Sequence, residues 1–211
     1  MASDVASGAR MTTELPSVDA LWLDTLQRIC TRAAHELKGA LNGVSVNLEV
    51  VRSRSERPDA QALSIATFAS SATDQLGAVI AMTDALLSLA RPAREPVDLG
   101  ATVRRLEALL AGAARTDGRT LELRGTIDDI GATSAIGNVA RLTLAASLLA
   151  ALEASSRVVC DANADGAAPL VRIECHDGAT PALDADVIAV AAEQGIGLTS
   201  EASAISISFP R

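Results

Sequence analysis

The chain of 211 residues carries 18 basic and 26 acidic side chains, for a formal net charge of -8. Hydrophobic residues make up 49% of the sequence, which is enough for a sizeable core and argues against wholesale disorder. The acidic balance argues against nucleic-acid binding, which depends on cations that meet phosphates, and the aromatic content of 1% argues against base stacking. Two histidines and three scattered cysteines do not have the spacing of a zinc cluster.

The N-terminal segment has no apolar core of the kind that signal peptides carry, and no stretch reaches the ~18 apolar residues that a membrane-spanning helix needs. An odd number of cysteines without paired spacing is typical of a reducing compartment. We therefore expect a cytoplasmic protein that makes no contact with a membrane. Residues 1–16 are expected to be a mobile tail that ends at Pro16.

Two amphipathic helices are predicted after this tail. In the first, the apolar residues recur at steps of three and four, and the segment ends in a charged turn at Pro58. A second helix is expected over residues 59–90. The predicted stripes are Leu26, Cys30, Ala33, Leu37, Leu41, Val44, Leu48 and Val51 in the first helix, and Ile65, Phe68, Ala72, Leu76, Val79, Leu86 and Leu89 in the second.

Two antiparallel helices have too little interior to be stable alone, so their stripes need a partner. A second copy of the chain would complete a four-helix bundle, and this homodimer is the favoured prediction. The alternative is that the hairpin packs against the second half of its own chain.

Pro92 and Pro96 interrupt the helical pattern and begin a mixed half. Helices are expected over residues 101–113, 141–155 and 184–193, and strands over residues 120–123, 157–160, 170–176, 196–198 and 204–209. The fold class predicted is α+β, with a tail (1–16), a helical hairpin (17–91) and a small α/β domain (92–211).

The first helix carries the sequence AHELKGALNGV around His35. This segment resembles the phosphoacceptor box of bacterial sensor histidine kinases, which has a histidine, an acid, an aliphatic residue and a basic residue in that order. The layout of hairpin, linker and α/β domain is similar too. The resemblance implies that His35 is the phosphoacceptor, and that Arg32, Gly39 and Asn42 belong to the surface where a partner docks. Gly39 stands where family members with phosphatase activity have Thr or Asn, which implies weak phosphatase activity or none.

The chemistry is sensible for these side chains. A neutral imidazole is a nucleophile near pH 7, and an exposed helical position lets a large protein reach it. Glu36 is expected to hold the far ring nitrogen, and Lys38, the only lysine in the chain, to attract the incoming phosphoryl group. By position alone, Glu36 and Lys38 are also compatible with ordinary surface charge on a helix.

The second half resembles a GHKL-type ATP-binding domain that has lost its nucleotide chemistry. The helix that carries metal-binding and phosphate-binding asparagines in that family reads LTLAASLLAALEAS here, with no asparagine between Asn138 and Asn163. Asp177-Gly178 stands where the first glycine box would begin, but the second glycine is missing. We interpret Gly195 as the end of a helix and not as part of a second glycine box, Cys175 as a core residue and His176 as the end of a strand.

The chain is thus most similar to the dimeric histidine phosphotransferases, and three functions stay open. The favoured prediction is a phosphorelay protein that shuttles a phosphoryl group between receiver aspartates of response regulators through His35. It needs no cofactor of its own, because Mg²⁺ is expected to come with the receiver. The alternatives are a scaffold or pseudokinase dimer that is never phosphorylated, and, less favoured, an active ATP-dependent histidine kinase.

Overall fold

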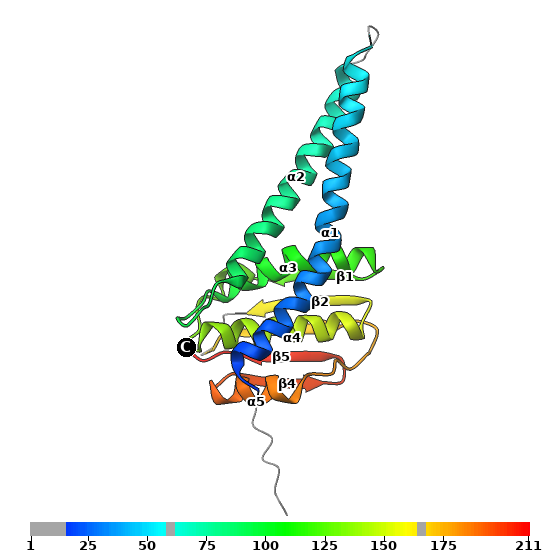
Figure 1. Cartoon of the computed structure of the whole chain (residues 1–211). Helices are drawn as coiled ribbons and strands as arrows, with labels where there is room; N and C mark the ends of the chain where they lie inside the picture. The colour runs from blue at the N-terminus through cyan, green and yellow to red at the C-terminus, as the bar shows by residue number, and fades with distance from the viewer. Residues whose placement is uncertain (1–15, 58–61, 164–167) are drawn as a thin grey trace, which may run out of the picture.

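The computed structural model describes residues 16–57, 62–163 and 168–211. Two long helices, α1 (Val18–Ser55) and α2 (Ala62–Ala90), form an antiparallel hairpin that projects from an α/β part (Figure 1). Helix α1 begins earlier than the apolar stripe predicted, because the Ser17 hydroxyl accepts a hydrogen bond from the Ala20 amide at 3.2 Å and caps its first turn. Most of the predicted tail and the turn at Pro58 lie outside the described residues.

The two helices of the hairpin are joined along their upper part by small and polar side chains. The Asn47 amide donates hydrogen bonds to the Ser71 hydroxyl at 3.1 Å and to the Gln75 carbonyl oxygen at 3.0 Å. A Cβ atom on Gly43 would lie 2.4 Å from the end of the Gln75 side chain, so the absence of a side chain at Gly43 leaves room for the Gln75 amide. Ala72 is buried in the same contact.

The α/β part is built on a five-stranded sheet with the order β1-β2-β3-β5-β4. Strands β1 and β2 are parallel, and all other neighbours are antiparallel. The strands are β1 (Thr120–Gly125), β2 (Arg157–Asn163), β3 (Leu170–Cys175), β4 (Gly197–Glu201) and β5 (Ala204–Ser208), with a short 3-10 turn, η1 (Ile127–Asp129), after β1. The predicted strands are all present, with ends that differ by up to three residues.

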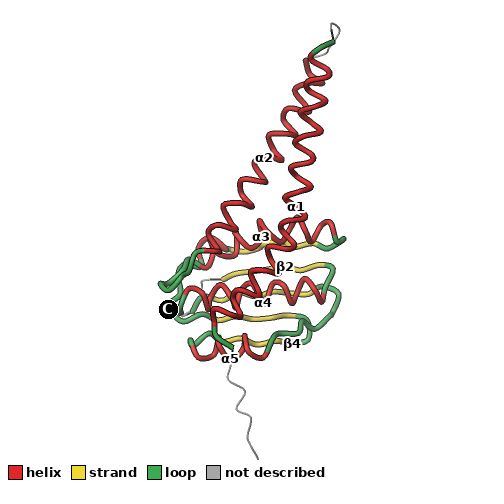
Figure 2. Tube along the Cα trace, in the orientation of Figure 1, coloured by secondary structure: helices red, strands yellow, loops and turns green. Residues whose placement is uncertain are grey.

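Three helices, α3 (Leu99–Thr116), α4 (Gly137–Ala154) and α5 (Ala185–Glu193), cover one face of the sheet, and the other face is open (Figure 2). Every residue of α4 from Gly137 to Leu152 is buried, because the sheet lies on one side of it and α1 on the other. The α+β class, with a helical hairpin followed by a small α/β part, is therefore confirmed.

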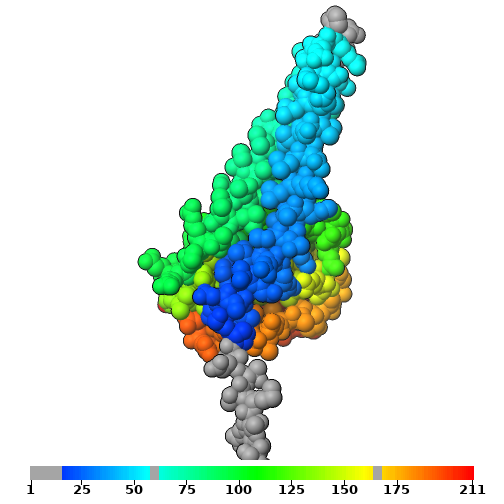
Figure 3. All heavy atoms as spheres, in the orientation of Figure 1, coloured from blue at the N-terminus to red at the C-terminus, as the bar shows by residue number. Residues whose placement is uncertain are grey.

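The base of the hairpin packs on the α/β part of its own chain. Trp22, Ile29 and Ala33 from α1 and Met82 and Leu89 from α2 belong to the same hydrophobic core as the sheet and α4. Figure 3 shows the N-terminal part of α1 lying across the surface of the α/β part. The sequence left open whether a second copy or the chain's own second half covers the hairpin. At the base of the hairpin, the α/β part of the same chain covers it.

The predicted stripe of α1 is right at Ala33, which is fully buried, and wrong at Cys30. Cys30, which it includes, is exposed, whereas Ile29 is fully buried. Farther along the hairpin, Leu41 and Leu48 are 51% and 52% exposed within the single chain. The less exposed face of α1 thus continues from Ile29 and Ala33 through Ala40 and Asn47 at steps of three and four residues.

The linker between α2 and α3 is tied to the start of α4. The Ala93 amide donates to the Asn138 Oδ1 at 2.9 Å, and the Asn138 amide donates to the Ala93 carbonyl at 2.7 Å. The Arg141 guanidinium donates to the Arg91 carbonyl just beyond α2, at 2.7 Å. The predicted domain boundary at residue 91 falls in this linker, although the buried side chains on its two sides form one continuous core.

Gly195 ends α5, as interpreted from the sequence. Its φ angle is +71°, and its amide and that of Ile196 donate to carbonyl groups in the last turn of the helix. None of the helices in the described part of the chain has the length and hydropathy needed to cross a membrane.

Candidate functional site

His35 lies on the exposed side of α1, two residues after the fully buried Ala33. It is therefore placed where the helix leaves the α/β part and enters the free portion of the hairpin. Lys38, Gly39 and Asn42 follow at three, four and seven residues and share this side of the helix, and all three are exposed. A Cβ atom on Gly39 would meet no atom within 4 Å, so open space surrounds this position.

Glu36 has a different environment, because its side chain lies against α3. The Thr116 hydroxyl lies 3.4 Å from the Glu36 Oε2 and 3.3 Å from the Gly112 carbonyl, and its single proton is shared between these two acceptors. A Cβ atom on Gly112 would lie 2.6 Å from the Glu36 Cδ, so the missing side chain of Gly112 makes room for this carboxylate. In the structure, Glu36 and His35 are not joined by a hydrogen bond, and Glu36 connects α1 to the α/β part.

Arg32 is also directed away from the exposed strip. Together with Arg28 it forms ion pairs with Glu153 near the end of α4, at 3.0 and 2.7 Å respectively. Its side chain is 29% exposed, so it is less accessible to a partner than Lys38 or Asn42. No local pattern in the sequence predicts this contact, since more than a hundred residues separate the arginines from Glu153.

Helix α1 covers the outward face of α4, the helix on which the resemblance would place nucleotide-binding asparagines. Over the C-terminal half of α4, Thr25 and Arg28 from α1 lie beside Ala146, Ala150 and Glu153, and the gap there measures only about 80 Å³. Pockets that hold small molecules usually measure ~300–1,000 Å³. The gap is therefore too small for a nucleotide in this arrangement.

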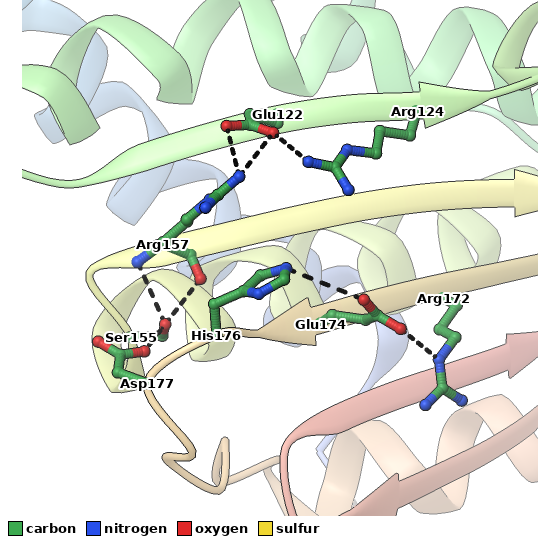
Figure 4. A network of polar contacts seen from close by, with 8 residues as sticks. All are labelled: Glu122, Arg124, Ser155, Arg157, Arg172, Glu174, His176 and Asp177. Atoms are coloured by element: carbon green, nitrogen blue, oxygen red, sulfur yellow. Dashed lines mark hydrogen bonds and ion pairs between the residues drawn. The ribbon is translucent and has the colours of Figure 1, made fainter.

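Asp177, where the resemblance would place the start of a glycine box, has its carboxylate engaged by the loop that follows α4. The Ser155 hydroxyl donates to one oxygen (Figure 4), and the Ser156 amide donates to the other at 2.7 Å. The hydrogen bond from Ser155, followed by that from Ser156, holds the pKa of Asp177 far below its usual range. The side chain thus closes the turn between α4 and β2.

The open face of the sheet carries alternating charges. Glu122 pairs with Arg124 at 2.8 Å and with Arg157 at 3.3 Å, and Arg172 pairs with Glu174 at 2.9 Å (Figure 4). The His176 Nε2 lies 3.9 Å from a Glu174 oxygen. These side chains are substantially exposed, and such pairs contribute little to stability.

The cysteines of the α/β part are core residues. Cys175 is buried while the neighbouring His176 is exposed, which confirms that the two side chains point to opposite faces. Burial, the main cause, raises the pKa of Cys175, and burial raises the pKa of Cys160 to about 12. Neither thiol is therefore an activated nucleophile. Within the described ranges, no group of three or more His, Cys, Asp or Glu side chains is arranged to hold a metal ion.

Comparison with known proteins gives no close relative: no family model and no curated protein matches the chain. Among solved structures, the histidine kinase AdeS of Acinetobacter baumannii is similar, with 14% sequence identity and a TM-score of 0.41. The match covers 83% of this chain and 97% of that chain. At this identity and TM-score, the similarity assigns neither a family nor a function to the chain.

Proposed function

We propose that the chain is a histidine phosphotransfer protein of a two-component phosphorelay. His35 accepts a phosphoryl group from the aspartyl phosphate of one response-regulator receiver and passes it to the aspartate of another. The observation that carries the proposal is the position of His35, exposed on a long helix directly above the contact of Glu36 with α3. A receiver that reaches His35 would rest on α1 and meet α3 beside it.

The transfer needs few groups from this chain. The imidazole nitrogen of His35 forms the N–P bond while the acyl-phosphate O–P bond breaks and the receiver carboxylate is released. Lys38, one turn farther along the same exposed side, attracts the phosphoryl oxygens. Gly39 and Asn42 flank the docking surface, whereas Arg32 is held by Glu153, and Mg²⁺ comes with the receiver.

Glu36 acts mainly through α3 in this proposal. Its hydrogen bond with Thr116 and its close approach to Gly112 fix the orientation of α1 around His35. It is therefore a positioning residue for the phosphoacceptor. Stabilisation of the far ring nitrogen would require Glu36 to leave α3 when the receiver binds.

A donor outside the chain is favoured over ATP by the packing of the α/β part. The C-terminal half of α4 is covered by α1, with a gap of about 80 Å³ there, and the Asp177 carboxylate is engaged by Ser155 and Ser156. Nucleotide binding would have to displace α1 from its ion pairs with Glu153. Titration calorimetry tests this step, and saturable ATP binding at micromolar concentration would overturn it.

The decisive experiment is phosphotransfer from radiolabelled, phosphorylated receiver domains of the same organism. Wild-type protein should gain acid-labile label that is stable in alkali, and His35→Ala should gain none. His176→Ala is the matched control, because it removes the other histidine of the chain and should label like the wild type. Equal labelling of wild type and His35→Ala would refute the phosphoacceptor role.

A non-phosphorylated scaffold is the second candidate, and the placement of Glu36 favours it. The acid next to His35 is occupied by Thr116, so the imidazole has no partner on its own helix to stabilise positive charge. If receivers bind the chain with micromolar affinity, and neither wild type nor His35→Ala is labelled by any of them, the scaffold is the better description.

We further propose that two copies associate through the upper hairpin. Leu41 and Leu48 of α1 and Leu76 and Ile80 of α2 are 46% to 55% exposed, and an apolar surface of this kind is usually covered by a partner. Two hairpins that cover each other would make a four-helix bundle. Solution scattering should then give twice the chain mass of 21.6 kDa.

A further inference from the structure

A cavity of about 520 Å³ lies at the junction of the hairpin with the α/β part. Four segments that are far apart in the sequence line it: the start of α1, the linker after α2, the start of α4 and the end of α5. Its volume falls within the ~300–1,000 Å³ that small-molecule sites usually have. No group that the phosphotransfer proposal uses lines this cavity.

The wall of the cavity is mainly apolar. Trp22, Leu26, Val139 and Val190 contribute to it, and Leu23 is 56% exposed beside it. Ile136, at the start of α4, is also exposed, by 43%. Large apolar side chains that stay in contact with water around a concave site favour the binding of a ligand with an apolar body.

The charges around the cavity select the polar end of such a ligand. Asp19 at the start of α1 and Glu193 at the end of α5 contribute two carboxylates, whereas Arg94 contributes one guanidinium. None of the three forms an ion pair with another residue of the described ranges. The local balance is therefore negative, and the net charge of -8 on the whole chain adds to it.

We infer that this cavity binds a small amphipathic amine. Its apolar body packs beside Trp22, and its ammonium group is directed to the rim formed by Asp19 and Glu193. Because the ligand would contact the hairpin, the linker and the α/β part together, it would strengthen their junction. This inference is independent of the phosphotransfer role of His35.

The chain has a built-in reporter for this test, since Trp22 is its single tryptophan and it contains no tyrosine. Fluorescence of the full chain is titrated with three probes that share one phenylbutyl body: 4-phenylbutylamine, 4-phenylbutanol and 5-phenylvalerate. All bring the same apolar surface but carry a positive, neutral or negative end. We expect saturable changes with phenylbutylamine and a Kd about tenfold lower than that of phenylvalerate.

Substitutions locate the binding site. Ala90→Phe, at the exposed last residue of α2, fills the mouth of the cavity and should weaken all three probes about tenfold or more. Ala81→Phe, the same change on the same helix but outside this cavity, should leave binding unchanged. Glu193→Gln should remove most of the preference for the amine over phenylbutanol. Leu23→Gln gives a second test of the apolar wall if Ala90→Phe does not fold.

Three results would overturn the inference. The first is a lack of any saturable change with phenylbutylamine. The second is phenylvalerate binding as tightly as phenylbutylamine, which would point to an anion held by Arg94 instead. The third is equal binding by Ala90→Phe and Ala81→Phe, which would place the probe elsewhere.

Discussion

Helix α1 covers the outward face of α4 only as long as the buried N-terminal part of α1 stays in the core. The substitution Ile29→Ala tests how strongly this part of α1 is held. Ile29 is fully buried in the core shared with α4 and the sheet. Its truncation loses the transfer free energy of the removed carbons and leaves a cavity, and such changes cost about 2–5 kcal/mol. Since α1 packs on a rigid, fully buried helix that has little freedom to collapse, we expect about 3 kcal/mol.

The assay is urea unfolding at fixed protein concentration, followed both by Trp22 fluorescence and by far-UV circular dichroism. The two transitions should coincide, because Trp22 and the sheet belong to one core. Val46→Ala is the matched control: it truncates an aliphatic residue on the same helix that is 63% exposed, and it should change stability by less than about 0.5 kcal/mol.

The reasoning would be refuted by a loss below about 1 kcal/mol in Ile29→Ala. It would also fail if the Trp22 signal changed at a lower urea concentration than the dichroism in the wild type. Either result would mean that the base of α1 detaches readily, and that the outward face of α4 is accessible after all.

Three other substitutions test separate features. Leu48→Glu places a charge on an apolar side chain that is 52% exposed and should reduce the scattering mass from a dimer to 21.6 kDa, whereas Leu170→Glu on the sheet should not; an unchanged dimer in Leu48→Glu would contradict the bundle. Asp177 has a folded-state pKa below its unfolded value, so its stabilisation is present above the unfolded pKa and is lost as the pH falls through the folded one. Asp177→Asn should therefore be less stable than wild type in neutral urea titrations, with the difference shrinking in acid; a constant difference at all pH values would argue against the ionised carboxylate. Gly39→Ala should raise stability by about 0.5–1 kcal/mol in thermal unfolding, because alanine is the better helix former and its methyl group meets open space at this position. A loss of stability would show that the added methyl group meets a neighbouring atom.

Local patterns predicted most of the fold. Periodicity of three and four residues indicated the hairpin, and the prolines of the linker marked its end, since α2 stops at Ala90 and α3 begins at Leu99. The strand positions followed from short apolar runs between turn residues. Gly195 was recognisable as a helix end because a left-handed residue is usually a glycine.

The partner of each helix face could not be predicted in the same way. Trp22, Thr25 and Ile29 are buried because α4 lies against them, but this contact joins residues more than a hundred positions apart. The periodic stripe therefore selected Cys30, as expected if this part of α1 packed only on α2. In the structure α4 is the neighbour here, and Cys30 is exposed. For the same reason the sequence assigned Arg32 and Glu36 to an exposed site, whereas Glu153 and Thr116 engage them.

The continuous 38 residues of α1 span two very different surroundings. At about 1.5 Å per residue the helix is roughly 57 Å long, so one end is held in the core while the other extends beyond it. In a single chain, amides near Ile29 should exchange their hydrogens only when the whole molecule unfolds, and amides near Val46 should exchange by local opening. His35 lies at the border between these regimes. A protein that binds at His35 would therefore slow amide exchange in the outer half of the helix. The distance from His35 over which exchange slows would show how much of the helix the bound protein stabilises.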